Sequence, residues 1–296
     1  MHIGIAGTGK MGTAIARRLL GLGHQVQVWN RTPQRTQPLL DAGAGWAETP
    51  QALVRAADTV VTMLTDEAAL QQVYLGDPGL LTGDVAGKLF IDMGTVRPAW
   101  PRQVGAAVEA AGARYLECPV GGSVGPALEG KLLGFVGGAP ADLERAHGLL
   151  AQLCRRVEHV GGFGAGATMK LAINLPLMVY WQTLSEALSI AQPLGLAPAR
   201  FIEILAETSG GPNMLKGRGP MIAQALAGTA GPQVSVDVAT MRKDLRSMLD
   251  EAAAQQVRLP LTALTLATFE QAGAAGLDAA DCTQLPVWWL REAGKV

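Results

Sequence analysis

A lysine and an asparagine stand four positions apart in the apolar stretch "TMKLAINLPLMVYW" of this 296-residue sequence. No charged side chain follows Lys170 between Leu171 and Ser185. Because burying an unpaired ammonium is costly, Lys170 is expected either to extend its amine to water or to serve a polar site. The spacing places Lys170 and Asn174 on one face of a helix. An ammonium there polarises a carbonyl and donates a proton when a hydride reduces it, and apolar surroundings bring a lysine pKa toward the working range.

A second candidate site lies at the start of the chain, where "IGIAGTGKMG" runs from a strand through a glycine-rich turn into a helix. In this pattern the first glycine permits a tight turn, the second lets the backbone approach a pyrophosphate, and the third allows close packing of helix and strand. Amides at the helix N-terminus favour an anion. The alternative is a glycine-rich turn that binds nothing. The pattern predicts a dinucleotide site made by Gly7, Thr8, Gly9, Lys10, Met11 and Gly12.

The segment after the second predicted strand, "VWNRTPQR", bears on which dinucleotide binds. A carboxylate at this place would suit a free ribose 2′-hydroxyl, whereas this chain has Asn30, Arg31 and Thr32. A guanidinium can hold a 2′-phosphate through several donors. These residues favour NADP(H) over NAD(H), unless Arg31 is only a solvated charge of the loop.

The elements that position these residues fall into two halves. Up to about residue 160, the sequence predicts seven strands, "HIGIAG", "QVQVWN", "DTVVTML", "KLFIDMG", "ARYLECP", "LLGFVGG" and "RRVEHVG". They alternate with predicted helices such as "PQRTQPLLDAG" at 33–43, which predicts a mostly parallel sheet with helices on both faces. The glycine-rich "GGFGAG" at 161–166 indicates a hinge or a tight turn. Beyond it the sequence predicts helices only, broken at "PLGLAP", "SGGPN", "KGRGP" and "GTAGP". We expect an α/β fold, with a Rossmann-type doubly wound domain over 1–161 and an all-α substrate and dimerisation domain over 162–296.

The composition argues against several classes of protein. With 49% hydrophobic and 17% charged residues the chain is expected to be packed, and its net charge of −1 provides no field for nucleic acid or anionic lipid. Three separated cysteines and four histidines without ligand spacing argue against a disulfide scaffold or a metal site. We expect reduced thiols, no signal peptide and a cytoplasmic location. The apolar run after Lys170 contains Asn174, Pro176 and Gln182, so a buried helix is favoured over a membrane span.

Motifs along nearly the whole chain carry a family resemblance: "IAGTGKMGTAIARRLLGLGH", "GHQVQVWNRT", "TMLTD", "IDMGTVRP", "CPVGGSVGPALEGKL", "GAGATMKLAIN" and "RKDL". Together and in this order they resemble the β-hydroxyacid dehydrogenase family. Within it, "MKLAIN", "GGS" and "NMLKGRGP" are most similar to the glyoxylate/succinic semialdehyde reductase branch. The 6-phosphogluconate dehydrogenases are longer and have histidine where this chain has Ile173, so the chain is not expected to be one of them.

The resemblance implies roles for several residues. Lys170 matches the catalytic lysine, and Asn174 matches the asparagine beside it. The turn that binds the substrate falls on Gly121, Gly122 and Ser123. Many members have serine where this chain has Gly121, which leaves the nature of the substrate acid open.

Further positions match residues that line the cofactor in the family, namely Met63, Leu64 and Thr95, while Lys243 of "RKDL" faces both cofactor and substrate. Residue type alone offers simpler interpretations. Met63 and Leu64 are then strand core, Thr95 is a helix N-cap, and Lys243 forms a solvated charge pair with Asp244 on a helix.

We therefore expect an NADPH-dependent oxidoreductase that interconverts a small aldehyde or 2-oxo acid and its hydroxy acid, with Lys170 as general acid and base. No metal, nucleic acid or membrane is expected as a partner, and a homodimer or homotetramer is expected through the second domain. Two alternatives stay open. One is an imine reductase on the same scaffold, which the retained Lys170 argues against and Gly121 keeps open. The other is an NADP(H)-binding module without turnover.

Overall fold

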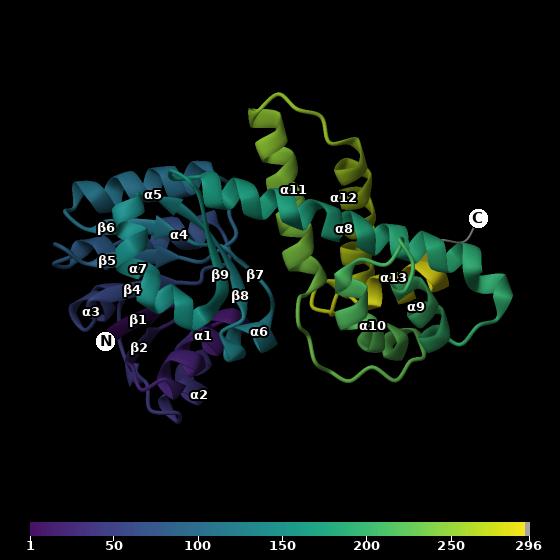
Figure 1. Ribbon diagram of the computed structural model, residues 1–296, viewed down its shortest axis with the longest axis horizontal. Helices are drawn as coiled ribbons and strands as arrows, with labels where there is room; N and C mark the ends of the chain where they lie inside the picture. The colour runs from purple at the N-terminus through teal and green to yellow at the C-terminus, as the bar shows by residue number, and fades with distance from the viewer. Residues whose placement is uncertain (294–296) are drawn as a thin grey trace. The chain divides into compact units, whose positions relative to one another are not determined.

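The computed structural model describes residues 1–293, so residues 294–296 at the end of the predicted second domain lie outside the described part. The chain divides into two compact units, Met1–Leu171 and Ala172–Val296 (Figure 1). Helix α8 (Ala165–Ala191) begins in the first unit and continues into the second. The domain boundary predicted after residue 161 lies ahead of this division and stays a prediction.

The first unit is built on a nine-stranded sheet with the strand order β3-β2-β1-β4-β5-β6-β8-β7, and β9 pairs with β8. The strands are β1 (His2–Ala6), β2 (Gln25–Trp29), β3 (Gly45–Trp46), β4 (Thr59–Thr62), β5 (Leu89–Asp92), β6 (Arg114–Glu117), β7 (Val120–Gly121), β8 (Leu132–Gly138) and β9 (Cys154–Gly161). The strands from β3 to β6 are parallel, whereas β8 runs antiparallel to β6 and β7. The strand order reverses between β1 and β4, and open sheets of this kind bind ligands at that point, beyond the carboxyl ends of the strands.

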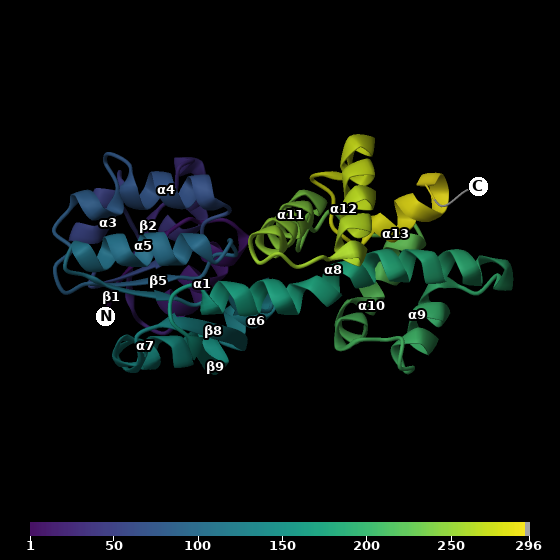
Figure 2. The ribbon, with the colours of Figure 1, turned by 90° about the horizontal axis from the view of Figure 1, so that it is seen from above.

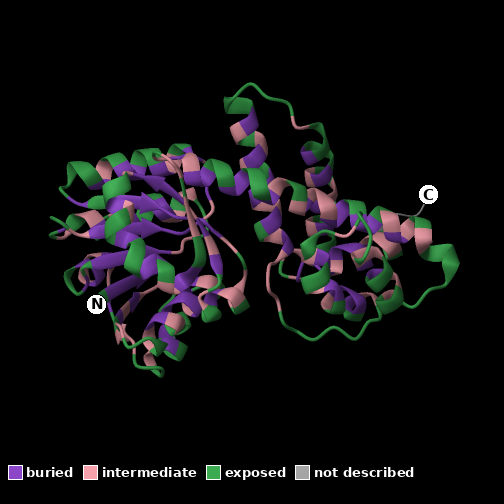
Figure 3. Cartoon of the chain, in the orientation of Figure 1, coloured by how far each residue is buried: buried purple, intermediate pink, exposed green. Residues whose placement is uncertain are grey.

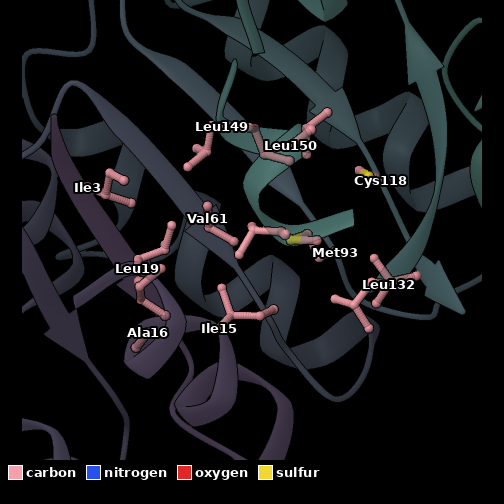
Figure 4. Close-up of a cluster of buried hydrophobic side chains, with 14 of the residues drawn as sticks. Ile3, Ile15, Ala16, Leu19, Val61, Met93, Cys118, Leu132, Leu149 and Leu150 are labelled. Carbon is pink, nitrogen blue, oxygen red and sulfur yellow. The ribbon is translucent and has the colours of Figure 1, made fainter. Parts of the chain in front are cut away.

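Helices cover both faces of this sheet (Figure 2). One face carries α1 (Lys10–Gly21), α2 (Gln37–Leu40), α6 (Val124–Glu129) and α7 (Pro140–Leu153), and the other carries α3 (Pro50–Arg55), α4 (Glu67–Leu75) and α5 (Ala99–Ala110). Successive side chains of a strand point to opposite faces of the sheet, so the same strands contribute to the hydrophobic cores on both faces. Ile3 belongs to one core cluster with Leu149 and Leu150 of α7 (Figure 4), as does Ile5. Ala6 belongs to the other cluster, which includes residues of α3, α4 and α5. The central strands β1, β4 and β5 are buried, and the outer faces of the helices are exposed (Figure 3).

The predicted fold class is confirmed, an α/β Rossmann-type unit followed by a helical one. All seven predicted strands are present, as β1, β2, β4, β5, β6, β8 and β9. The segment 33–43, predicted as one helix, is a 3₁₀ turn (Pro33–Thr36) followed by the one-turn helix α2. Because proline fits the first turn of a helix but not its interior, Pro33 and Pro38 each lie in the first turn of a separate short helix.

The second unit continues from α8 with α9 (Pro198–Ala206), α10 (Asn213–Leu226), α11 (Val238–Ala254), α12 (Pro260–Ala272) and α13 (Gln284–Trp288). The prediction that "KGRGP" breaks a helix is wrong, because α10 runs through it. The reason is packing. A Cβ on Gly219 would lie 2.9 Å from Cγ2 of Ile202, so glycine lets α10 lie close against α9.

None of the helices in the described part of the chain combines the length and the apolar character needed to cross a membrane. The cytoplasmic location stays a prediction. All three cysteines are buried and free of disulfides.

Candidate active site

The glycine-rich turn between β1 and α1 lies where the strand order reverses. Gly7 has a φ of +98°, and its amide donates to the carbonyl oxygen of Trp29 at 2.9 Å. A Cβ on Gly7 would overlap the carbonyl oxygen of Met63, and a Cβ on Gly12 would overlap that of Gly7. A Cβ on Gly9, by contrast, would meet no atom within 4 Å. The chain itself requires the first and third glycines, whereas Gly9 leaves open space beside the start of α1.

The N-terminus of α1 is suited to an anion. Its N-cap, Gly9, makes no side-chain cap, and its first turn contains no acidic residue, so its donors and partial positive charge are uncompensated. Thr8 is only 3% exposed, and its hydroxyl oxygen has no hydrogen-bond partner among the described residues. In the first turn of α1, Lys10 is exposed and Met11 packs partly against the core.

The loop after β2 is tied to this turn by Asn30. Its Oδ1 accepts from the amide of Thr8 at 3.0 Å, and its Nδ2 donates to the carbonyl oxygen of Thr32 at 2.9 Å. Arg31 and Thr32 are exposed. Asn30 thus shapes the loop through bonds within the protein and leaves the guanidinium of Arg31 open to solvent.

Three predicted cofactor residues follow β4 and β5. Met63 and Leu64 are half-buried just beyond β4 and pack against the cores on opposite faces of the sheet. Thr95 is half-buried in the loop after β5. The alternative interpretation of Thr95 as a helix N-cap is wrong, because α5 begins at Ala99 and its N-cap is Pro98.

The predicted substrate turn joins β7 to α6. Gly122 has a φ of +126°, and a Cβ there would lie 2.8 Å from Cδ2 of Leu132, so glycine is required. Gly121 could accommodate a side chain, since a Cβ there would lie 3.5 Å from the Cβ of Leu133, an ordinary van der Waals contact. Ser123 is the N-cap of α6, and its side chain makes no capping bond. The turn therefore presents backbone amides and the hydroxyl of Ser123.

Lys170 and Asn174 both lie on α8, one turn apart, and each is 9% exposed. Lys170 belongs to the first unit and Asn174 to the second. Both residues are therefore largely buried, and the role of the Lys170 amine stays a prediction.

In the second unit a buried carboxylate lies between two predicted site residues. Oδ2 of Asp244 accepts from Nδ2 of Asn174 at 3.4 Å, and Oδ1 lies 2.7 Å from Nζ of Lys243. Asp244 is 5% exposed, and the side chain of Lys243 is 32% exposed. The interpretation of Lys243 and Asp244 as a charge pair agrees with this contact, but the pair is not fully solvated, because Asp244 is buried. Sequence reasoning did not predict the bond between Asp244 and Asn174.

Comparison with known proteins identifies the family. A model of the NAD binding domain of 6-phosphogluconate dehydrogenase matches residues 2–161, and a model described as NAD-binding of NADP-dependent 3-hydroxyisobutyrate dehydrogenase matches residues 164–288. A 3-hydroxyisobutyrate dehydrogenase of Pseudomonas aeruginosa is 37% identical over 268 residues, covering 88% of this chain and 89% of that protein. The chain belongs to the β-hydroxyacid dehydrogenase family.

Further relatives agree with this assignment. Glyoxylate/succinic semialdehyde reductase 1 of Arabidopsis thaliana is 31% identical over 281 residues, covering 95% of this chain and 96% of that protein. A solved structure described as Psf3 in complex with NADP⁺ and 2-OPP is 30% identical with a TM-score of 0.86, covering 96% of this chain and 99% of that one. As a β-hydroxyacid dehydrogenase, the chain is an oxidoreductase of an NAD(P)-dependent family whose members act on small hydroxy acids.

The first unit of this β-hydroxyacid dehydrogenase fits a dinucleotide. The open space at Gly9 and the unpartnered hydroxyl of Thr8 both lie at the uncapped start of α1. Backbone amides at such a helix start bind pyrophosphate. These residues would hold the phosphates of either NAD or NADP.

Sequence reasoning also passed over two acids at strand ends of the first unit, Asp92 on β5 and Glu117 on β6. Asp92 is 1% exposed and accepts from Oγ1 of Thr62 at 2.8 Å, from the amide of Gly94 at 3.2 Å and from the hydroxyl of Tyr115 at 3.4 Å. Burial raises the pKa of Asp92, although these donors oppose the rise. The available signal was an acid closing an otherwise apolar strand at the edge where such sheets bind ligands.

Proposed function

We propose that this chain reduces a small aldehyde or 2-oxo acid to its hydroxy acid with NADPH, and that Lys170 donates the proton. The supporting observation is a buried lysine one helical turn ahead of a buried asparagine on α8. When bound, NADPH supplies the hydride that the reduction consumes.

Lys170 supplies the acid. Its ammonium donates a hydrogen bond to the carbonyl oxygen, polarises the carbonyl, and passes a proton to the alkoxide as the alkoxide forms. In the direction of oxidation the neutral amine accepts that proton. Asn174, oriented by its hydrogen bond to Asp244, holds the substrate beside the lysine, and Lys243 contributes a second positive charge.

The turn at Gly121, Gly122 and Ser123 receives the carboxylate of the substrate. Consecutive backbone amides in such a turn form a concave set of donors for an anion. The hydroxyl of Ser123, which does not cap α6, adds a further donor. A substrate with both a carbonyl and a carboxylate, such as a semialdehyde, suits this arrangement.

The test of the lysine is the variant Lys170→Ala, assayed with succinic semialdehyde, glyoxylate and NADPH. We expect kcat to fall by about 10²- to 10⁴-fold, the usual range for loss of a general acid, with the Kd for NADPH unchanged. Lys88→Ala is the control, because Nζ of Lys88 donates to the carbonyl oxygen of Ala57, away from this turn of α8. Unchanged turnover in Lys170→Ala would contradict the proposal, and faster reduction of a cyclic imine than of any carbonyl would favour the imine reductase.

We assign the preference for NADPH to Arg31. The loop at 30–32 contains no carboxylate, and the guanidinium is exposed beside the bonds that Asn30 makes. In Arg31→Ala we expect the KM for NADPH to rise roughly tenfold, the loss of one charge-assisted bond, while the KM for NADH stays constant. Arg55→Ala on α3 is the control. Equal changes for both cofactors would remove the role of Arg31 in their discrimination.

We also propose that the chain self-associates through the second unit. Large apolar side chains are exposed at the end of α8 and just after it, with Ile190 82%, Leu194 68% and Leu196 44% exposed. Such a patch commonly marks an interface. Sedimentation should show a dimer or tetramer, and Ile190→Glu should shift it toward monomer. A monomer at micromolar concentration in the unaltered protein would exclude this proposal.

A further inference from the structure

The carboxylate of Glu117, the last residue of β6, lies at the start of α8. Its Oε1 accepts from the amides of Gly164 at 2.5 Å and Gly166 at 3.0 Å, and its Oε2 accepts from the amide of Ala167 at 3.0 Å. Glu117 is 1% exposed. The first amides of a helix have no partner within the helix, so one side chain from the sheet satisfies the start of α8.

Two glycines make room for this carboxylate, and a third lets the turn pass close to Arg102. A Cβ on Gly137 of β8 would overlap Oε1 of Glu117, and one on Gly166 would lie 3.2 Å from the carboxyl carbon. Gly164 has a φ of +93°, and a Cβ there would lie 2.6 Å from Nε of Arg102. The stretch "GGFGAG" is therefore a tight turn shaped around the side chain of Glu117.

The sheet holds Glu117 in place. Thr62 pairs in register with Asp92, and Asp92 pairs in register with Glu117, so three polar residues form a row at the carboxyl ends of β4, β5 and β6. Thr62 donates to Asp92 at 2.8 Å, and the hydroxyl groups of Thr62 and Tyr74 lie 3.1 Å apart. Strand pairing fixes the backbone of Glu117, and the three amides at the start of α8 hold its carboxylate.

We propose that Glu117 is a positioning residue that fixes the first turn of α8 to the sheet and thereby sets the place of the Lys170 amine. Ala167, which donates to Glu117, and Lys170 are three residues apart and lie on the same side of the helix. Fraying or tilting of this turn displaces the lysine. The inference rests on the proposed role of Lys170 as proton donor.

The protonation state of Glu117 gives this role a pH dependence. Burial raises the pKa of Glu117 to about 7, although the amides of Ala167, Gly166 and Gly164 lower it. Below that pH the carboxyl group carries a proton and loses part of its capacity to accept from the helix. The titratable or charged groups on the segments packed around it are Asp92 on β5, Tyr115 on β6, Cys118 just after β6, His159 on β9, Arg102 on α5 and Lys170 on α8.

The test compares Glu117→Gln with Asp142→Asn in the full-length protein. Glutamine keeps one acceptor oxygen but turns an NH₂ group toward an amide donor. Asp142 is a buried acid in the first turn of α7, so it controls for loss of a helix-start carboxylate elsewhere. Three kinds of measurement are made. The first is kcat with the KM values for succinic semialdehyde and NADPH between pH 6 and 9, the second is trace acetylation of Lys170 relative to Lys88, and the third is amide hydrogen exchange of residues 162–170.

In Glu117→Gln we expect kcat to fall by about 10- to 100-fold, as for a small displacement of a reacting group, with the KM for NADPH within about twofold. The ratio of Lys170 to Lys88 acetylation should change, and exchange in the first turn of α8 should accelerate. The unaltered protein should show a transition in that exchange near pH 7, and Asp142→Asn should show none of the changes seen in Glu117→Gln.

Two outcomes would overturn the role of Glu117: an unchanged acetylation ratio in Glu117→Gln, or equal effects in Asp142→Asn. If Glu117→Gln does not fold, exchange in the unaltered protein decides, and the absence of a transition near pH 7 overturns the role. Acetylation and exchange need no turnover, so they test Glu117 even if Lys170→Ala retains full activity and the proposed function fails.

Discussion

The turn at Gly7–Gly12 in the first unit presents backbone, whereas the cluster of Asn174, Lys243 and Asp244 in the second unit presents side chains. The conformation of the turn depends on the absence of side chains, since a Cβ on Gly7 or Gly12 would overlap a main-chain carbonyl oxygen. The cluster works by burying polar atoms that satisfy one another. One site is therefore sensitive to an added methyl group and the other to a removed functional group.

The two sites also differ in the exposure to solvent that each requires. Backbone donors at a helix start need no partner charge, so the turn can stay open to solvent and still attract an anion. A buried carboxylate such as Asp244 is stable only with its donors in place, because an unpaired buried charge is costly. If this difference is real, an added methyl group should damage the glycine turn, and removal of a charge should damage the cluster around Asp244. Equal responses of the two sites to either change would contradict it.

The largest effect is expected from Gly12→Ala. The added methyl group meets main-chain oxygen that cannot move without distorting the turn, so we expect a loss of about 3 kcal/mol or more and a fall in Tm of roughly 6–12 °C. NADPH binding should be lost with it. Gly9→Ala is the matched control, because its methyl group enters open space. There we expect an unchanged Tm and weaker NADPH binding. Equal melting of the two variants would show that the turn is not constrained as described.

The second effect is expected from Asp244→Asn, which keeps the shape of the buried group and removes its charge. Lys243 loses its ion pair, and the bond to Asn174 loses its charged acceptor, so we expect kcat to fall roughly tenfold and Tm by about 4 °C. Glu270→Gln on α12 is the control, because its ion pair with Arg246 of α11 is exposed and should contribute little. Similar losses of activity in both variants would contradict a special role for Asp244.

Local patterns were enough to predict much of this molecule. The spacing of Gly7, Gly9 and Gly12 and the alternation of strands and helices predicted the Rossmann-type unit, because both depend on residues near one another in sequence. The four-residue spacing of Lys170 and Asn174 predicted a shared helix for the same reason. The two-residue strands β3 and β7 were not predicted, because such short strands exist only through pairing with distant neighbours.

The partners of the site residues were beyond the reach of local patterns. Glu117 is 50 positions from Ala167, and Asp244 is 70 positions from Asn174, so neither bond has a sequence spacing that reveals it. The helix through "KGRGP" was missed because packing against Ile202 outweighs the low helix propensity of glycine. Packing between residues that are distant in sequence can therefore outweigh the local helix propensity of a segment.

The smallest effect is expected from Gly121→Ser, which adds a side-chain donor to a turn that otherwise presents backbone amides. The new Cβ would lie 3.5 Å from that of Leu133 and 3.6 Å from Cε2 of Phe135, so the turn can keep its shape. One added hydrogen bond contributes about 1 kcal/mol, so we expect the KM for succinic semialdehyde to fall about fivefold at constant kcat. Gly122→Ser, at a φ of +126°, should instead lower Tm. A KM that falls equally for uncharged aldehydes would show that this turn binds the carbonyl end, because both kinds of substrate have a carbonyl and only the acids have a carboxylate.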